Sequence, residues 1–195
     1  MTICGLDEAG RGALAGPLVA AAIVCSPHIV SGSLKIKDSK LLTAKERNKI
    51  YRWIIKNKIS FTTEIISTRQ INNRGIGWAN KEIFKRLIKK IDARKYFVDG
   101  NLKIKVKDKG DRVKSVVDAD ATILPCILAG IVAKVTRDKM MTDLGQLKKF
   151  RKYQWKINKG YGTKTHIMML KDHGATRYHR SVFVTTALKV KTENP

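Results

Sequence analysis

Residues 2–25 read TICGLDEAGRGALAGPLVAAAIVC, and this stretch decides the fold. Its two apolar runs, TICGLD and PLVAAAIVC, predict neighbouring central strands joined by a glycine-rich loop. The second run is too short to cross a bilayer and is interpreted as a buried strand. Asp7 and Glu8 therefore stand where the first strand meets the loop, and Gly10 and Gly12 make a sharp turn easy there.

The rest of the chain alternates helical and strand patterns. Thr43 and Glu46 form a capping box ahead of apolar residues at helical spacing, which predicts a helix. The other predicted elements are a strand at 59–67, an amphipathic helix at 74–91, a strand at 95–100, strand-like ends of 103–122 around a turn, a long apolar helix at 123–144, a basic stretch at 148–160, a helix at 165–174 and a polar tail. Interleaved strands and helices predict an α/β fold.

Composition limits the partners and the compartment. The 195 residues suit one globular unit, and 40 Lys and Arg against 16 Asp and Glu give a net charge of +24. Such a charge favours a polyanionic partner, nucleic acid above all, although a lysine-rich proteome would also raise it. Three scattered cysteines in apolar runs indicate reduced thiols in a cytoplasmic protein, with no membrane segment.

Four carboxylates lie at predicted element ends. Asp7, Glu8 and Asp99 follow or end strands, and Asp120 falls at or just before the start of the long helix. Each alone is most simply a strand-end residue or a helix cap. Together they would repel one another unless a cation lay between them, and hard oxygen ligands suit Mg²⁺ or Mn²⁺. Because side chains alternate along a strand, Glu8 can join Asp7 only if the strand ends there and the loop redirects it.

Seven ordered motifs resemble bacterial ribonuclease HII, a type 2 ribonuclease H family, over nearly the whole chain. They are DEAGRG at 7–12, GPLVAAAIV at 16–24, DSK at 38–40, VDG at 98–100, AKVTRD at 133–138, GYGT-x-x-H at 160–166 and HG-x-T-x-x-HR at 173–180.

The resemblance implies a ribonuclease H-like fold. This is a mixed central β-sheet flanked by helices, with a catalytic domain at 1–165 and a C-terminal helical extension at 166–195. It implies a metal-dependent endonuclease that hydrolyses the RNA strand of RNA/DNA hybrids and cuts 5' of single ribonucleotides in duplex DNA. The products carry 3'-hydroxyl and 5'-phosphate ends, and two Mg²⁺ or Mn²⁺ ions take part. We expect a monomer whose partner is nucleic acid.

The resemblance also implies roles for particular residues. It implies that Asp7, Glu8, Asp99 and Asp120 are catalytic and hold the metal, with Asp118 as the alternative to Asp120. The substrate-binding residues that it implies are Gly10, Arg11, Gly12, Ser39, Lys40 and Tyr161. The glycine-arginine loop would meet the 2'-hydroxyl, the group that distinguishes RNA from DNA. For Ser39 and Lys40, a helix N-terminus just beyond them also suggests phosphate binding, while an ordinary solvated lysine is equally compatible.

Other polar residues are not assigned to catalysis. His166, His173 and His179 lack the spacing of a zinc site, so structural or substrate-side roles are expected. Asp138 resembles a residue near the family's site, but Arg137 and Asp138 suit a surface pair on a helix equally well. The stretch KKFRKYQWK is interpreted as a solvated face with two half-buried aromatics, or as a surface that follows a phosphate backbone.

Three positions depart from the family pattern. Ala13 stands where proline is common, Asp118 where lysine is usual, and Gly130 where serine is found. Asp118 would add repulsion near the metals, and glycine costs about 1 kcal/mol of helix propensity. These departures motivate one alternative, a catalytically impaired RNA- or hybrid-binding protein. Another is a nuclease with a related acidic centre that cuts DNA, such as a recombinase.

Overall fold

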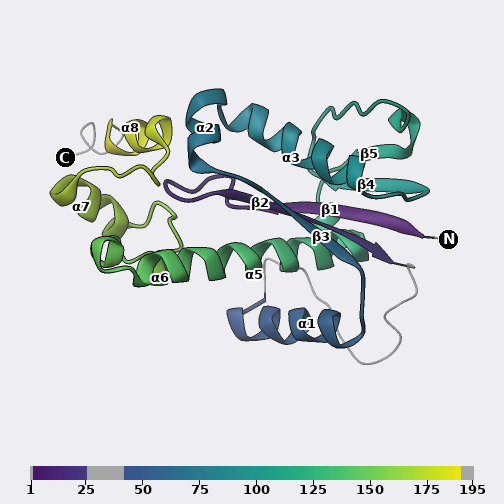
Figure 1. Ribbon diagram of the computed structural model, residues 1–195, viewed down its shortest axis with the longest axis horizontal. Coiled ribbons are helices and arrows are strands. Elements are labelled where there is room, and N and C mark those ends of the chain that lie inside the picture. Colours follow the sequence, from purple (N-terminus) through teal and green to yellow (C-terminus); the bar gives the residue numbers. More distant parts are fainter. Residues whose placement is uncertain (1, 26–41, 190–195) are drawn as a thin grey trace. The chain divides into compact units, whose positions relative to one another are not determined.

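The computed structural model describes residues 2–25 and 42–189, which form two compact units (Figure 1). The boundary expected between residues 165 and 166 stays a prediction. The first unit contains Met1–Ala9, Val19–Ile65 and Asn80–Val135, and the second contains Gly10–Leu18, Ile66–Ala79 and Thr136–Pro195.

A five-stranded mixed sheet is the centre of the first unit. Its strands are β1 (Ile3–Ala9), β2 (Leu18–Cys25), β3 (Phe61–Ile66), β4 (Lys95–Asp99) and β5 (Val113–Val116), in the order β3-β2-β1-β4-β5. β1 runs antiparallel to β2 and parallel to β4, and β4 runs parallel to β5. The predicted mixed sheet and its two N-terminal central strands are confirmed.

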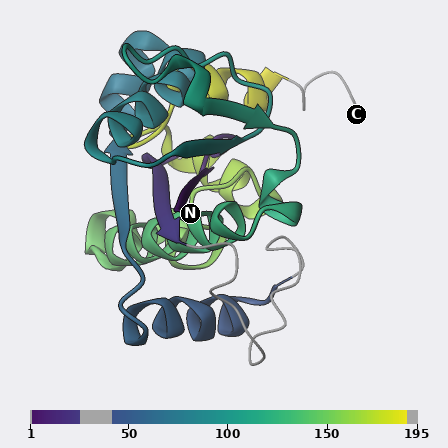
Figure 2. The same ribbon diagram turned by 90° about the vertical axis from the view of Figure 1, so that its right-hand side faces the viewer.

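Helices cover both faces of this sheet (Figures 1 and 2). α1 (Ala44–Lys56) and the first part of α5 (Leu124–Gln146) lie on one face, and α3 (Ile76–Lys90) lies on the other. Ile23 of β2, Ile54 of α1 and Ile131 of α5 are fully buried in one apolar cluster. Gly5 allows β1 to approach α5, because a Cβ there would lie 2.2 Å from the carbonyl carbon of Pro125. The α1 capping box of Thr43 and Glu46 is present as predicted.

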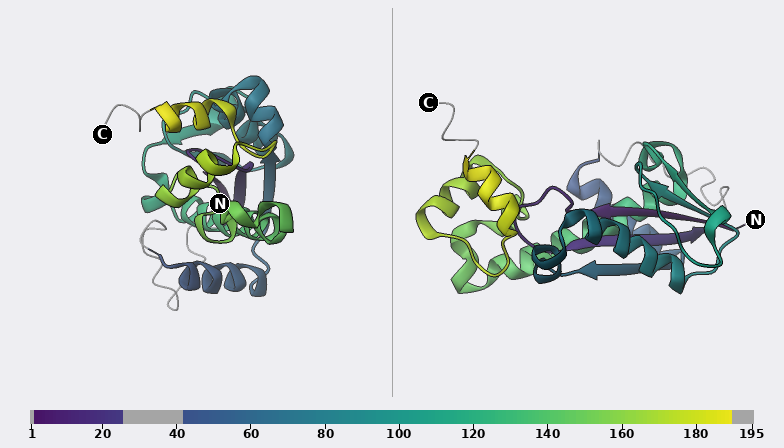
Figure 3. Two further views of the ribbon diagram at one scale, coloured as in Figure 1. Left: turned by 90° about the vertical axis from the view of Figure 1, so that its left-hand side faces the viewer. Right: turned by 90° about the horizontal axis from the view of Figure 1, so that it is seen from above.

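The second unit is helical and has an aromatic core. It contains α2 (Thr68–Arg74), the second part of α5, a 3-10 helix (Lys148–Tyr153), α6 (Trp155–Asn158), α7 (Lys164–His173) and α8 (Ser181–Lys189). α7 and α8 lie side by side (Figure 3). Tyr153 and Trp155 stack with ring centroids 5.2 Å apart, and both are fully buried. The expectation of half-buried aromatics on a solvated face is therefore wrong, because the chain folds inward around these rings.

Three elements differ from the prediction. No element was predicted for residues 68–73, which belong to α2, although Ser67 and Gln70 form a capping box that could have identified this helix. α8 occupies part of the predicted polar tail, where β-branched residues concealed the helix. Residues 103–107 form no strand, because β5 occupies the edge of β4 instead. Ile104 and Val106 are nevertheless buried.

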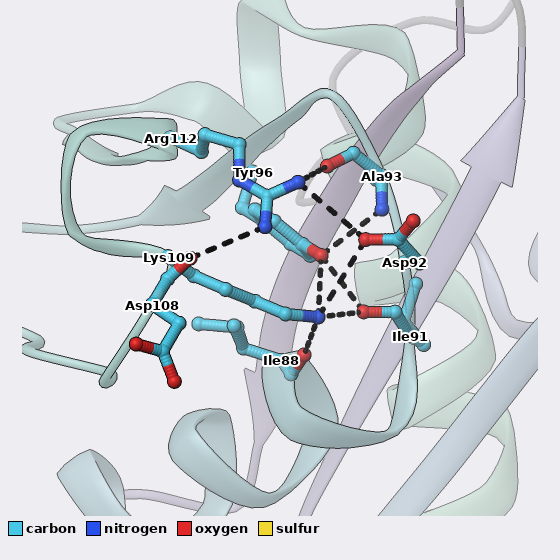
Figure 4. A network of polar contacts seen from close by, with 8 residues as sticks. All are labelled: Ile88, Ile91, Asp92, Ala93, Tyr96, Asp108, Lys109 and Arg112. Carbon is cyan, nitrogen blue, oxygen red and sulfur yellow. Dashed lines mark hydrogen bonds and ion pairs between the residues drawn. The ribbon is translucent and has the colours of Figure 1, made fainter.

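Lys109 anchors the segment that leads to β5 (Figure 4). Its ammonium donates hydrogen bonds to the carbonyl oxygens of Ile88 and Ile91, at 3.0 and 2.5 Å, and to the hydroxyl of Tyr96 at 3.0 Å. The Tyr96 hydroxyl in turn donates to the Ile91 carbonyl at 2.7 Å. This network ties the segment to the end of α3 and to the start of β4.

The three cysteines are buried and unpaired, as predicted. Cys4 lies in β1, Cys25 in β2 and Cys126 in α5, so each thiol belongs to the packed first unit. Among the described residues, no helix is both long and apolar enough to span a membrane.

Candidate active site

The sheet register brings Asp7 and Asp99 to neighbouring positions. β1 and β4 are parallel, and their pairing runs from Ile3 with Lys95 to Leu6 with Val98. The next residue on each strand is Asp7 or Asp99. Because paired residues of parallel strands present their side chains on the same face, the carboxylates of Asp7 and Asp99 lie side by side on one face of the sheet.

Asp120 is held beside Asp99 by a helix-capping contact. It lies in the one-turn helix α4 (Ala119–Thr122), and its backbone N–H donates a 3.1 Å hydrogen bond to Oδ1 of Asp99. Asp118, at the N-cap position, has a left-handed backbone with φ of 55° and makes no capping hydrogen bond through its side chain. The carboxylate of Asp99 therefore caps α4 in place of Asp118. Asp120 is buried, whereas Asp118 is exposed.

Asp7 is the most perturbed member of the acidic group. Its side chain is buried, with 8% exposed, and Oδ1 accepts a 2.6 Å hydrogen bond from the backbone N–H of Glu8. Burial raises the pKa of Asp7 well above its usual range, and the charges of Glu8, Asp99 and Asp120 raise it further. The charges that act on Asp7 thus come from the three other predicted acids.

Glu8 is not redirected towards Asp7 in the way that the sequence predicted. β1 does not end at Asp7 but continues through Ala9, and Glu8 pairs with Ala20 of β2. Alternation then sends the side chains of Asp7 and Glu8 to opposite faces of the sheet. Glu8 is nevertheless the strongest charged contributor to the raised pKa of Asp7. The two carboxylates are therefore coupled electrostatically, although their side chains leave opposite faces of the sheet.

The donor chemistry of the four acids fits a divalent cation. Within residues 2–25 and 42–189, no three His, Cys, Asp or Glu side chains stand in the arrangement of a preformed metal site. The carboxylate set supplies only hard oxygen donors, which Mg²⁺ and Mn²⁺ prefer. A cation near Asp7 would also oppose the repulsion that raises its pKa.

In the second unit, the glycine-arginine loop turns sharply at Gly10. Its φ is 95°, a region that favours glycine, and a Cβ there would lie 2.0 Å from Nε of Arg137. Arg11 and Gly12 are exposed, while the carbonyl oxygen of Arg11 accepts a 2.8 Å hydrogen bond from Nη1 of Arg180. The tip of the loop, Arg11 and Gly12, is therefore exposed to solvent, whereas the two arginines that contact the loop, Arg137 and Arg180, are buried.

Tyr161 belongs to the same unit and is fixed through its backbone. Its N–H donates to the carbonyl of Asn158 at 2.9 Å, and its ring lies 4.9 Å from the guanidinium carbon of Arg137. Arg137 is fully buried, so the expectation that it forms a surface pair with Asp138 is wrong. The signal that could have identified it is its spacing, because Ala133 and Met141, four residues away on either side, are also buried.

A chain of buried imidazoles supports the carbonyl of Tyr161. Nδ1 of His166 lies 2.9 Å from that oxygen, and Nε2 of His166 lies 3.1 Å from both Nε2 of His179 and Nε1 of Trp155. Nδ1 of His179 accepts from the N–H of Thr176 at 2.9 Å. These partners assign one proton to each imidazole, on Nδ1 of His166 and on Nε2 of His179. Both histidines therefore have a structural role, as expected.

Two predicted substrate contacts, Ser39 and Lys40, lie outside the described residues. The other predicted residues form two groups. The first unit contains Asp7, Glu8, Asp99 and Asp120, and the second contains Gly10, Arg11, Gly12 and Tyr161.

Comparison with known proteins identifies the family. The family model for ribonuclease HII matches residues 4–186. Ribonuclease HII of Rickettsia conorii is 40% identical over 184 residues, which cover 93% of this chain and 90% of that protein. The fold is similar to that of RNase HII in the PCNA:RNase HII complex from Archaeoglobus fulgidus, with a TM-score of 0.79, 25% identity and coverage of 92% of this chain and 94% of that one.

A more distant structure shares the fold alone. Bst-RNase HIII in complex with Mn²⁺ aligns with a TM-score of 0.73 and 18% identity, over 100% of this chain and 71% of that one. The family match and the close relative together cover almost the whole sequence. The chain belongs to the ribonuclease HII family, and it is a ribonuclease H, an endonuclease that acts on RNA/DNA hybrids.

Proposed function

We propose that Asp7, Glu8, Asp99 and Asp120 are the metal-holding catalytic group, and that this group also cuts duplex DNA 5' of a single embedded ribonucleotide. The observation that carries the proposal is geometric: the β1–β4 register brings Asp7 and Asp99 to neighbouring positions, and the backbone N–H of Asp120 donates to Oδ1 of Asp99. The charges of Glu8, Asp99 and Asp120 also raise the pKa of Asp7. Cleavage would leave 3'-hydroxyl and 5'-phosphate ends.

The expected cofactor is Mg²⁺ or Mn²⁺, with two ions during catalysis. Such ions supply a Lewis acid at the phosphodiester and a more acidic bound water. The chain's own contribution is to hold oxygen donors: Asp7 and Asp99 on one face of adjacent strands, and Asp120 fixed by the Asp99 cap. The complex of Bst-RNase HIII with Mn²⁺ supports the choice of ion.

Selectivity for ribonucleotides is proposed to come from the second unit. Gly10, Arg11 and Gly12 would approach the ribose, because an exposed glycine-bounded loop lets the main chain come close to a 2'-hydroxyl. Tyr161 would pack against the adjacent sugar. The large positive charge supports affinity for the phosphate backbone without sequence preference. The expected monomer and cytoplasmic location stay predictions.

The test uses three duplexes of the same sequence: one with a single ribonucleotide, one RNA/DNA hybrid and one all-DNA duplex. The parent protein should cut the first two with Mg²⁺ or Mn²⁺ and leave the third intact. Asp7→Asn should abolish cutting. Binding without cutting under both metals would favour the impaired hybrid-binding alternative, and cutting of the all-DNA duplex would favour the recombinase-like alternative.

A further inference from the structure

Two buried arginines in the second unit donate hydrogen bonds from their guanidiniums to backbone carbonyl oxygens. Arg137 and Arg180 are each 0% exposed. Burial lowers the pKa of Arg137, and the charge of Asp138 opposes this effect. Because a guanidinium presents its donors in a fixed fork, such bonds fix the direction of the main chain, which apolar packing alone would not do.

Arg137 joins two segments that are distant in the sequence. Its Nε donates to the carbonyl of Pro17, Nη2 to that of Ala15 and Nη1 to that of Lys159, each at 3.0 Å. The planar guanidinium presents its donors in a fixed fork, so it sets the relative direction of all three carbonyls. The segment that follows the glycine-arginine loop is thereby tied to the segment that leads to Tyr161.

Arg180 holds the same loop from a second point. Its Nε donates to the carbonyl of Gly16 at 3.1 Å and its Nη1 to that of Arg11 at 2.8 Å, while its backbone N–H donates to the carbonyl of Leu14 at 2.8 Å. The three consecutive carbonyls at 15–17 thus alternate between the two guanidiniums. Both arginines thus donate hydrogen bonds to backbone carbonyl oxygens of the same loop.

This arrangement costs free energy that an apolar core would not. Nη2 of Arg180 is buried without a hydrogen-bond partner among the described residues. Burial, together with the charge of Arg137, lowers the pKa of Arg180 to about 9. Apolar side chains of similar volume often stabilise a core as well as buried charges do, but they do not fix the direction of a carbonyl. Directional control of the loop is what the two guanidiniums add.

Arg137 also contacts both elements of the proposed recognition site. A Cβ on Gly10 would collide with its Nε, and its guanidinium lies against the ring of Tyr161. The space for the turn at Gly10 and the position of the Tyr161 ring are therefore set by one side chain. Displacement of this side chain would move both elements together.

We propose that Arg137 and Arg180 are positioning residues for ribonucleotide recognition: by binding the carbonyl oxygens of Arg11 and of residues 15–17, they fix the main chain of the glycine-arginine loop together with Tyr161. The inference rests on the recognition role proposed for that loop. It assigns to the two arginines an effect on discrimination between ribose and deoxyribose that is separate from the chemistry at Asp7.

The experiment measures binding in an Asp7→Asn background, so that the substrate stays intact. Dissociation constants are determined for a duplex with one ribonucleotide and for the matched all-DNA duplex. Their ratio is compared for the background protein and for Arg137→Lys and Arg180→Lys, which keep the charge but lose the fork. Arg151→Lys is the matched control, since the guanidinium of Arg151 donates to the carbonyl of Gln146, outside the loop. Thermal unfolding sets an assay temperature at which each protein is folded.

We expect the ratio to fall about 5- to 10-fold in both loop variants, equivalent to about one net hydrogen bond, and to stay unchanged in the control. If either lysine variant fails to fold, Arg180→Gln, which keeps a neutral donor, takes its place. An unchanged ratio in folded variants overturns the inference while the recognition role stands. Equal binding of both duplexes by the background protein overturns the recognition role, and the inference with it.

Discussion

Oδ2 of Asp7 lies where a side chain on Gly130 would begin: a Cβ on that glycine would be only 2.3 Å from the oxygen. Gly130 lies inside α5, where glycine is unfavourable, and it departs from the serine of the family pattern. In this chain the missing Cβ leaves room for the buried carboxylate. Gly130 is therefore a neighbour of the Asp7 carboxylate as well as a residue of α5.

Gly130→Ala should therefore favour the helix while it lowers the cleavage activity. Alanine gains up to about 1 kcal/mol of propensity but pushes Oδ2 of Asp7 out of its place, so we expect cleavage to fall about 10- to 100-fold. The measurement is kcat/KM on the hybrid duplex, beside thermal unfolding. Gly77→Ala in α3 is the control, because a Cβ there meets no atom within 4 Å. Full activity in Gly130→Ala would show that the carboxylate tolerates displacement.

Removal of the Asp7 charge should weaken the stabilisation of the protein by metal. Because its folded pKa is raised above the ordinary value of 3.8, the metal-free parent should lose stability as pH rises past that value. Asp7→Asn should lack this loss. Thermal unfolding in a chelator, then with Mg²⁺ or Mn²⁺, checks this: the ion should stabilise the parent more than the variant. Equal stabilisation of both proteins would place the ion elsewhere.

The buried imidazole pair predicts acid sensitivity in the second unit. Burial and the neighbouring His166 lower the pKa of His179 to about 4, below its usual 6.5. The unfolded chain therefore binds more protons between these values, and stability should decline as pH falls from 6.5 towards 4. Acidification to pH 5 should cost about 2 kcal/mol.

His179→Gln tests this assignment, because glutamine can hydrogen-bond but does not titrate in this range. The variant should be less stable than the parent at pH 7, yet its free energy of unfolding should change less between pH 7 and pH 5. Denaturant unfolding at several pH values measures both quantities. Parallel pH profiles for parent and variant would mean that another group is responsible. His173→Gln serves as the control, since His173 is exposed at the end of α7.

Lys109→Met should destabilise the first unit. Methionine keeps much of the apolar stem but removes the donor to two carbonyls and to the Tyr96 hydroxyl, so we expect a loss of about 1 to 3 kcal/mol. The free energy of unfolding in urea is the measurement. The exposed Lys105→Met is the matched control and should change stability by less than about 0.5 kcal/mol. If Lys109→Met lowers the free energy of unfolding no more than Lys105→Met does, water replaces the hydrogen bonds of the Lys109 ammonium.

Local patterns predicted the sheet and its attached helices well. The apolar runs around Asp7 and the capping box at Thr43 depend on contacts between residues that are close in the sequence, and the structure contains both the predicted strand and the predicted capping box. The four acids could be proposed from their positions at element ends. The sequence did not predict that β1 continues through Glu8. Where a strand ends depends on contacts between segments that are distant in the sequence, and a short pattern does not contain that information.

The buried support of the loop could not be predicted in the same way. An arginine in a helical sequence is normally interpreted as solvated, and Arg137 becomes interior only because backbone carbonyls from residues 15, 17 and 159 converge on it. Likewise, Tyr153 and Trp155 lie among lysines, yet their rings form a core with residues from distant segments. Contacts between distant segments determine both outcomes, and no short pattern encodes them.

The three interior thiols have a practical consequence for experiments in solution. Burial raises the pKa of Cys4 to about 12 and that of Cys25 to about 11, and it raises the pKa of Cys126 as well. A thiol must ionise to react with maleimides or peroxide, so the native cysteines should stay inert while the protein is folded. A single cysteine introduced at an exposed position outside the glycine-arginine loop, such as Lys152, could then carry a fluorophore without prior removal of the others.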